Sequence, residues 1–378
     1  MTAKKPVKKK KKGEEVCYPY VDKERSSKAQ LKRIWRLLKA LFSYSIVKIF
    51  ILLVFIISIF PVLIFLIYRP HVQQNINYGI TFSNKYAQEL GLDWKDAYIK
   101  ILDDLGVKNI RLVTYWDEVE PAFGEYDYSN IKWQLDEAEK RNVNVILVVG
   151  KKTLRWPECF SPDWVDKVTD PADKQAFVNN YIRESVNELK GYDSIMMWQV
   201  ENEPFFPFGV CDGKITKDNL EEEISIVRSL DSRPILVQDS GEGGFWYPTY
   251  KMGDYLGISM YRKIWYDFWG VFFKKFIYFK YPLAHWSYKV KAGILGVPYD
   301  KIIVTELQAE PWGPAISSEL SDVEKNKSMS KSDFLATISY AQKAGFKDLY
   351  LWGAEWWLWE KEFNNNPFYW DTAKVLFK

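Results

Sequence analysis

The sequence predicts an α/β protein, a (β/α)8 TIM barrel preceded by one N-terminal transmembrane helix. Three observations support this prediction. The chain has 378 residues with 47% apolar content, enough to bury a large core. Short β-rich runs alternate eight times with longer amphipathic segments over about 300 residues, the pattern and length of such a barrel. An uncharged apolar run, residues 49–67, precedes this alternating part.

The apolar run is long enough to cross a bilayer. A helix of this length spans roughly 28 Å, close to the hydrocarbon thickness of about 30 Å. Pro61 is tolerable because local adjustments can satisfy the carbonyl it frees. A buried core helix and a cleaved signal peptide are the alternatives, but such a run is uncommon in soluble proteins, and the 48 residues before it exceed a normal signal leader. We expect residues 49–68 to form a transmembrane helix.

Charge is distributed unevenly along the chain. Residues 1–48 contain 15 Lys or Arg against 4 Asp or Glu, whereas the whole chain has 52 against 49. The positive-inside rule therefore predicts a basic cytoplasmic tail, 1–48, and an extracytoplasmic barrel domain, 69–378, at the cell membrane. The lysine-rich start of the tail could bind anionic lipid or nucleic acid weakly, and no other nucleic-acid binding is expected.

Eight β-rich runs are candidate barrel strands, in the order 76–82, 109–116, 143–150, 194–202, 234–240, 255–261, 301–307 and 348–356. Alternation with helices implies parallel strands joined by right-handed crossovers. The runs are bounded by helical segments or loops, so each is expected to contribute one strand.

Five segments between these runs have apolar residues at helical spacing: 94–106, 128–142, 170–191, 216–231 and 331–345. Ser129 and Asp170, the latter followed by Pro171, are candidate caps. The helix expected near 246–253 is short. Residues 265–289 are dense in aromatic residues and lysines, which indicates either a loop and helix covering the barrel or an element that touches the membrane.

Two glutamates occupy positions suited to catalysis. Active sites of TIM barrels lie at the C-terminal ends of the strands. Glu203 closes the fourth predicted strand and Glu306 the seventh. If the fourth strand is regular, Gln199, Glu201 and Glu203 share one face, with Glu203 nearest the solvent. Glu201 remains the second candidate for the acid.

Several motifs carry a family resemblance: Asn202-Glu203-Pro204 after strand four, Glu306 in IIVTELQAEPW, Arg111 in NIRL, Tyr261 in GISMY and Trp352 in LYLWG. With these motifs, residues 76–378 resemble glycoside hydrolase clan A, the retaining (β/α)8 glycosidases, either cellulase-like or β-galactosidase-like. The resemblance implies Glu203 as acid/base, Glu306 as nucleophile and Asn202 as the ligand of the sugar 2-hydroxyl. Arg111 and Tyr261 would keep Glu306 ionised and oriented.

This chemistry explains why two carboxyl groups are needed. A retaining glycosidase requires a protonated acid for the leaving oxygen and an ionised nucleophile for the anomeric carbon, about 5 Å apart. Aromatic rings stack on sugar faces, so tryptophans near strand ends are candidate ligands of an oligo- or polysaccharide. These are Trp116, Trp156, Trp312, Trp352, Trp356 and Trp357, of which Trp116, Trp312 and Trp352 are the predicted substrate-binding set. Glu310 and Glu355 could bind sugar hydroxyls.

Cys159 and Cys211 follow the neighbouring third and fourth strands, while Cys17 lies in the predicted cytoplasmic tail. We predict a Cys159–Cys211 disulfide, which is consistent with an oxidising compartment. Closing a loop of about 50 residues stabilises a fold by roughly 4 kcal/mol in the chain-entropy model.

Other chemistries find little support in the sequence. The chain has two histidines, no CxxC pair, no GxxxxGK[ST] loop and no GxGxxG after a strand, so neither a metal nor a cofactor is expected. The prediction is a membrane-anchored retaining glycoside hydrolase. A non-catalytic carbohydrate-binding barrel and a transglycosylase that uses the same residues remain the alternatives.

Overall fold

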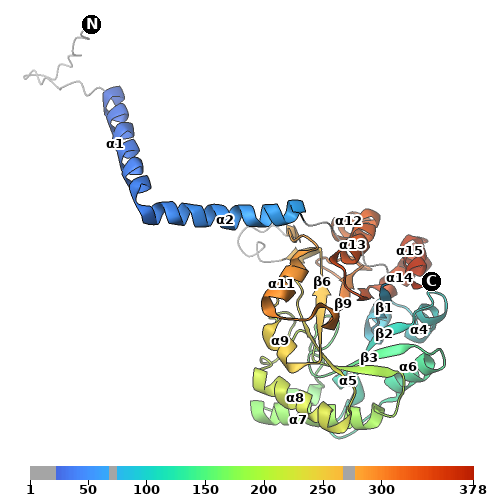
Figure 1. The fold of residues 1–378 in the computed structure, drawn as a ribbon. Coiled ribbons are helices and arrows are strands. Elements are labelled where there is room, and N and C mark those ends of the chain that lie inside the picture. The colour runs from blue at the N-terminus through green and yellow to red at the C-terminus, as the bar shows by residue number, and fades with distance from the viewer. Residues whose placement is uncertain (1–22, 68–74, 267–276) are drawn as a thin grey trace, which may run out of the picture. The chain divides into compact units, whose positions relative to one another are not determined.

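The computed structural model describes residues 23–67, 75–266 and 277–378 and divides the chain into two units, Met1–Arg69 and Pro70–Lys378. The second unit is a closed barrel of eight parallel strands with helices around its outside (Figure 1). The predicted (β/α)8 barrel is therefore confirmed.

All eight predicted strands form the barrel, and their order around it is β1-β10-β9-β6-β5-β4-β3-β2. Their bounds are β1 (Asn77–Thr81), β2 (Asn109–Val113), β3 (Asn144–Val149), β4 (Ile195–Val200), β5 (Ile235–Asp239), β6 (Tyr255–Met260), β9 (Ile302–Gln308) and β10 (Asp348–Trp352). The eighth prediction extended too far, because the chain turns at Gly353, with φ 126°, and enters a helix at Ala354.

The helices of this unit are α3 (Asn84–Glu89), α4 (Trp94–Asp103), α5 (Trp116–Val119), α6 (Ser129–Glu139), α7 (Pro171–Leu189), α8 (Lys217–Leu230), α9 (Tyr247–Met252), α11 (Ser287–Leu295), α12 (Asp322–Met329), α13 (Lys331–Ala344), α14 (Ala354–Phe363) and α15 (Phe368–Lys374). Asp170 caps α7 as predicted, since its side chain accepts from the Ala172 amide. Ser129 is not a cap, because it is already the first residue of α6.

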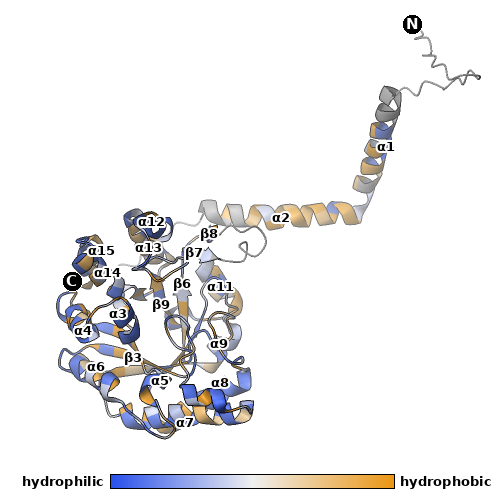
Figure 2. Cartoon of the chain, turned by 180° about the vertical axis from the view of Figure 1, so that it is seen from behind, coloured by the Kyte–Doolittle hydropathy of each residue, from blue (hydrophilic) through white to orange (hydrophobic). Residues whose placement is uncertain are grey.

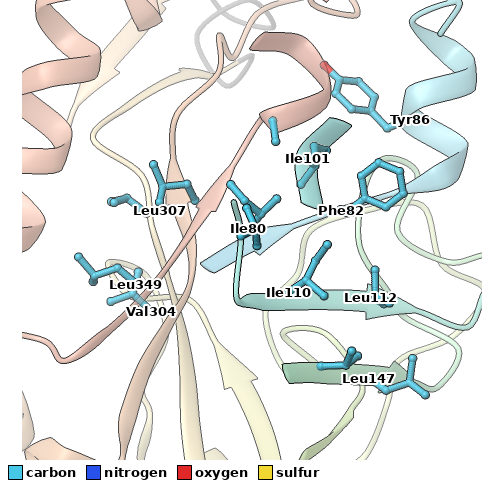
Figure 3. Packing of buried hydrophobic residues seen from close by; sticks show 14 of the residues in the cluster. Ile80, Phe82, Tyr86, Ile101, Ile110, Leu112, Leu147, Val304, Leu307 and Leu349 are labelled. Carbon is cyan, nitrogen blue, oxygen red and sulfur yellow. The ribbon is translucent and has the colours of Figure 1, made fainter. Parts of the chain in front are cut away.

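Two hydrophobic layers hold the barrel together. Inside it, alternate residues of neighbouring strands form one cluster: Ile146, Met197, Leu236, Ile303 and Tyr350. Outside it, the opposite strand faces pack against the helices, as Figure 3 shows for Ile80, Ile110 and Leu112 beside Ile101 of α4. Because side chains fill the interior of the barrel, an active site is expected at the ends of the strands.

The aromatic segment 265–289 differs from the loop and helix expected for it. Lys263–Tyr266 (β7) and Ile277–Lys280 (β8) pair as an antiparallel hairpin before α11, and residues 267–276 lie outside the described part. The predicted loop and helix therefore missed a hairpin. Contact of this segment with a membrane remains a prediction.

The first unit contains α1 (Lys23–Ser43) and α2 (Ser45–Ile67). The apolar run thus forms part of one helix, coloured hydrophobic along most of its length in Figure 2. Within the described residues, no single helix meets the length and hydropathy expected of a membrane span, while Gln30–Ala40 and Ser45–Phe60, bent by 85°, meet them only as a pair. The lysine-rich start of the tail lies outside the described residues.

Candidate active site

A β-bulge turns Glu306 toward the barrel mouth. On the β6 side, Ile258 pairs with Val304 but Ser259 pairs with Glu306, so Thr305 is an extra residue on β9. The pairing with β10 shifts at the same place. Without the bulge, alternation from the inward Ile303 would point Thr305 inward and Glu306 toward the helices.

Glu306 accepts hydrogen bonds from three side chains on three other strands or their ends. Arg111 Nη1 donates to Oε1 at 3.0 Å, Gln238 Nε2 to the same oxygen at 2.8 Å, and the Tyr261 hydroxyl to Oε2 at 3.1 Å. A cation and two neutral donors favour the charged form of a carboxyl group. The contacts predicted from Arg111 and Tyr261 to Glu306 are therefore present, and they fix the orientation of its carboxyl group.

Arg111 links the two predicted catalytic strand ends. Its side chain is fully buried, and its Nη2 donates to Asn202 Oδ1 at 2.8 Å, next to Glu203. It also donates through Nε to Gln199 at 2.8 Å and through Nη2 to Gln238. One guanidinium therefore orients both Asn202 and Glu306.

The fourth strand does not stay regular up to Glu203. It ends at Val200, and Glu201 and Glu203 both adopt left-handed conformations, with φ of 59° and 44°. Such conformations cost about 1–3 kcal/mol each and are typical of functional sites. Gln199, Glu201 and Glu203 consequently do not share a face, which contradicts the prediction made for a regular strand.

Glu201 is used for structure. Its carboxylate accepts from the backbone amides of Lys151 at 2.8 Å and Lys152 at 2.6 Å. Gly150 lies so close to Glu201 that a Cβ on this glycine would be 2.6 Å from the carboxylate carbon. Glu201 is fully buried, and Glu223 of α8 is its neighbour. These contacts favour a structural role for Glu201, and its choice as the acid over Glu203 is not expected.

Glu203 combines burial with two polar contacts. Ser259 Oγ donates to its Oε1 at 2.6 Å, and Lys152 Nζ donates to its backbone oxygen at 2.8 Å. Burial, and next the negative charge of Glu306, raise the pKa of Glu203 to about 8. Glu203 therefore holds a proton at neutral pH, as a general acid does, while Glu306 accepts from one cation and two neutral donors.

The raised pKa of Glu203 predicts how stability depends on pH. A carboxyl group with a folded pKa near 8 and an unfolded pKa near 4.3 stabilises the fold fully below the unfolded value, and this contribution is lost as pH rises through 8. Glu203→Gln cannot lose a proton. We expect the unfolding free energy of this variant, relative to the native chain, to rise by on the order of 3 kcal/mol between pH 5 and pH 8.

Urea unfolding at several pH values measures this difference. An exposed substitution, Glu125→Gln, serves as the matched control, and its difference from the native chain should stay constant with pH. A Glu203→Gln difference that is equally flat would contradict the protonated state assigned to Glu203.

The predicted tryptophan ligands separate into two groups. Trp312 lies at the mouth, with its ring 5.1 Å from that of Tyr261. Trp116 is 1% exposed and stacks on Tyr181, which contradicts its predicted contact with substrate. Trp356 and Trp357 are buried on α14, because the eighth strand ends before them.

Trp352 lies at the mouth with its ring largely buried. It is 6% exposed, and the guanidinium carbon of Arg155 lies 4.0 Å from its ring centre. Arg155 covers the face of the ring that it contacts, and binding of substrate by Trp352 stays a prediction.

Two residues of the site were not identified from the sequence: Gln238, which donates to Glu306, and Ser259, which donates to Glu203. Gln238 lies near the end of β5, and Ser259 lies two residues before Tyr261 on β6, so period-two alternation places Ser259 and Tyr261 on one face. That alternation was a usable signal for Ser259.

The predicted disulfide is present between Cys159 and Cys211, whose Cα atoms are 5.2 Å apart. It joins the loops after β3 and β4. Beside it, the Val210 amide donates to the Pro157 oxygen at 2.9 Å, and the rings of Trp156 and Phe208 lie 5.8 Å apart. The bridge therefore fixes two loops that border Glu203.

Reducing this bridge should destabilise the protein. For a sequence separation of 52 residues, we expect the unfolding free energy of Cys159→Ser/Cys211→Ser to fall by about 2–5 kcal/mol. Urea unfolding with and without dithiothreitol tests this: the reductant should shift the native midpoint but not that of the double variant, with Cys17→Ser behaving as native. Equal midpoints for native and double variant would show that the bridge contributes nothing.

Comparisons with known proteins identify the family and the fold. Residues 75–346 match the family Cellulase (glycosyl hydrolase family 5). The crystal structure of GH5_18 from Bifidobacterium longum subsp. longum aligns with a TM-score of 0.50 and 13% identity, covering 74% of this chain and 70% of that chain. A variant of that protein in complex with Manβ1-4GlcNAc gives 0.51 and 12%, covering 73% and 68%.

A β-galactosidase from Rahnella sp. R3 aligns with a TM-score of 0.50 and 10% identity, covering 75% of this chain and 52% of the other. At such identities these alignments show the shared fold. The family match itself extends over most of the chain. The protein therefore belongs to glycosyl hydrolase family 5, the cellulase family of clan A.

Proposed function

We propose that the chain is a retaining glycoside hydrolase that cleaves an O-glycosidic bond of an oligo- or polysaccharide by double displacement. The observation that carries this proposal is that two neighbouring carboxyl groups have different environments. Glu306 receives three donors, including the Arg111 cation, while burial and the charge of Glu306 keep the proton on Glu203. A non-catalytic carbohydrate-binding barrel has no need of this difference.

In the first step, a carboxylate oxygen of Glu306 attacks the anomeric carbon while Glu203 gives its proton to the leaving oxygen. The glycosyl ester on Glu306 carries no negative charge. The negative charge that helped to raise the pKa of Glu203 is then gone. The pKa of Glu203 therefore falls, and its carboxylate can remain ionised.

In the second step, ionised Glu203 takes a proton from a water molecule whose oxygen attacks the anomeric carbon, and Glu306 leaves as a carboxylate. Asn202 is oriented for the sugar 2-hydroxyl, since Arg111 binds its Oδ1 and leaves Nδ2 as the donor. Transfer to a sugar hydroxyl in place of water would be transglycosylation with the same residues.

The stereochemistry of the product tests the mechanism. A panel of 4-nitrophenyl β-glucoside, β-mannoside and β-galactoside is offered to the full-length chain in detergent, and early products are followed by proton NMR. We expect the β-anomer of the free sugar to appear first and the α-anomer only by mutarotation. The α-anomer appearing first would contradict double displacement.

We also propose that residues 49–68 anchor the enzyme in the cell membrane, with the N-terminus cytoplasmic and the barrel outside. The apolar side chains of α2 are exposed along the helix, among them Ile49, Phe50, Phe55 and Ile57. The basic excess before α2 and a disulfide in the barrel support this orientation.

Membrane extraction tests the anchor. The full-length chain should stay with the membrane pellet in alkaline carbonate and be released by detergent. A shortened chain, residues 70–378, should be recovered in the supernatant. Release of the full-length chain by carbonate alone would refute a transmembrane anchor.

A further inference from the structure

Arg155 lies in an unusual position at the barrel mouth. It follows β3, has a left-handed φ of 74° and is 7% exposed. Its guanidinium carbon is 3.7 Å from the ring centre of Tyr86, labelled in Figure 3, and 4.0 Å from that of Trp352. The guanidinium is therefore held between two aromatic rings, which gives a cation–π contact on both of its faces.

Two carboxylates fix the guanidinium in its plane. Arg155 pairs with Glu310 through Nη1 and with Glu355 through Nη2 at 3.1 Å. Glu310 Oε1 also accepts from Trp352 Nε1 at 2.8 Å, and Glu355 Oε1 accepts from the Ser83 amide at 2.7 Å. We call Arg155, Glu310 and Glu355 the Arg155 cluster. Its three residues follow β3, β9 and β10, and the hydrogen bond from Ser83 connects them to the segment after β1.

The cluster contains two polar atoms that lack partners within the described part of the chain. Glu310 Oε2 and Arg155 Nε are buried and make no hydrogen bond. The hydroxyl of Tyr86 is close enough to Glu310 to lower the pKa of that carboxyl group, although its geometry directs the hydrogen bond to Ser317 Oγ at 3.1 Å. A buried polar atom left unpaired costs about 1–3 kcal/mol. A sugar hydroxyl, which both donates and accepts, could satisfy one atom of each kind.

The Arg155 cluster lies on the side of the nucleophile. Glu310 follows Glu306 by four residues on the same strand and loop, and Trp352 pairs in register with Gln308. Tyr261, which donates to Glu306, experiences the charges of both Glu310 and Arg155. In double displacement the sugar that becomes attached to the enzyme sits over the nucleophile. The cluster therefore borders the glycone subsite.

The part of the mouth that reaches the loop after Glu203, where Phe208 lies, has a different character. A series of ring contacts runs outward from Tyr261 to Trp312 at 5.1 Å, on to Phe208 at 5.5 Å, and then to Trp156 at 5.8 Å. Trp156 is 63% exposed. Aromatic faces of this kind suit successive sugar rings of a leaving group.

From this asymmetry we propose that the Arg155 cluster is the end wall of the glycone subsite: it binds hydroxyls of one terminal sugar, excludes a second, and makes the enzyme exo-acting. The proposal rests on the glycosidase function proposed above. Gly353 supports the wall, because a Cβ there would meet the Cβ of Glu310 at 2.6 Å.

Cleavage of labelled oligosaccharides by the full-length chain in detergent tests the wall. The probes are β-1,4-linked pentaoses of glucose, mannose and galactose with a fluorescent label at the reducing end. We expect labelled tetraose first, then triose, with free monosaccharide released in equal amount. Labelled biose or triose formed before the tetraose would overturn the wall but leave the glycosidase function intact. No cleavage of any pentaose or aryl glycoside would refute both.

Two conservative variants test the individual residues. Arg155→Lys removes Nε and the planar stack but keeps the charge, and Glu310→Gln keeps the shape. For 4-nitrophenyl glycosides we expect kcat/KM to fall by about 10- to 100-fold, as for hydrogen bonds to charged groups, mainly through KM. Glu362→Gln, at an exposed ion pair of the same helix as Glu355, is the control and should keep native values. Native kcat/KM in both cluster variants, with folding confirmed by circular dichroism, would overturn the assignment.

Discussion

Replacing Glu306 by glutamine is expected to reduce hydrolysis of every aryl glycoside to the level of the enzyme-free blank. Glutamine has nearly the same shape, and its single amide oxygen can still accept from Gln238 while its NH2 group faces the Tyr261 hydroxyl. Its neutral amide oxygen cannot form the glycosyl ester, so the covalent step is lost rather than slowed. Absorbance of released 4-nitrophenol measures the effect, with Glu125→Gln as the exposed control.

The Glu203→Gln variant should behave differently, which separates the two roles. We expect a fall in kcat of about 10²- to 10⁴-fold, the usual range for a general acid or base. The loss should be larger for leaving groups that need a proton than for 4-nitrophenolate. Azide should restore turnover in Glu203→Ala, because it needs no general base, and should give a β-glycosyl azide.

Two outcomes would show that the roles are assigned wrongly. One is azide rescue of Glu201→Ala in place of Glu203→Ala. The other is equal loss in Glu203→Gln for good and poor leaving groups. Glu201 binds the amides of Lys151 and Lys152, so its substitution should instead lower stability.

The barrel and its catalytic strand ends could be predicted because they depend on local patterns. Each β-rich run lies between helical segments, and parallel strands bring all their C-terminal ends to one rim. That rule was enough to place Glu203, Glu306 and the two cysteines at one rim, although not to give the directions of the two carboxyl side chains. The helix that contains residues 49–67 followed from apolar composition in the same way.

What could not be predicted depends on departures from the regular strand. Alternation along a regular β9 points Glu306 outward, and only the bulge at Thr305 reverses this. Likewise, β4 stops at Val200, so the positions of Glu201 and Glu203 follow from left-handed residues rather than from period two. A single residue of register decides the face of a side chain, and the sequence carries no marker of either event.

The remaining differences from the predictions concern tryptophans near strand ends, and they arise from tertiary packing. Trp116 follows a strand end, as a ligand would, yet α5 begins there and turns the ring onto Tyr181. Arg155, from a loop distant in sequence, lies against the ring of Trp352, and nothing in the sequence indicates this contact. Proximity to a strand end therefore identifies candidates, and the loops select among them.

Arg111→Met is expected to cause the largest loss of stability of any single substitution in the site. It leaves the buried carboxylate of Glu306 without its cation, and Asn202 and Gln199 without a donor. Removing one partner of a buried ion pair costs about 3–5 kcal/mol, because the remaining charge stays uncompensated. Activity should be lost as well, since Asn202 and Glu306 are no longer oriented together.

Urea unfolding measures this cost, and a double-mutant cycle identifies its source. Arg111→Met/Glu306→Gln removes the charge that would be left unpaired, so it should be more stable than Arg111→Met alone. Arg228→Met is the matched control: its exposed pair with Asp254 should contribute less than about 1 kcal/mol. If the double variant is no more stable than Arg111→Met, the loss comes from packing, and the ion pair with Glu306 does not hold the site together.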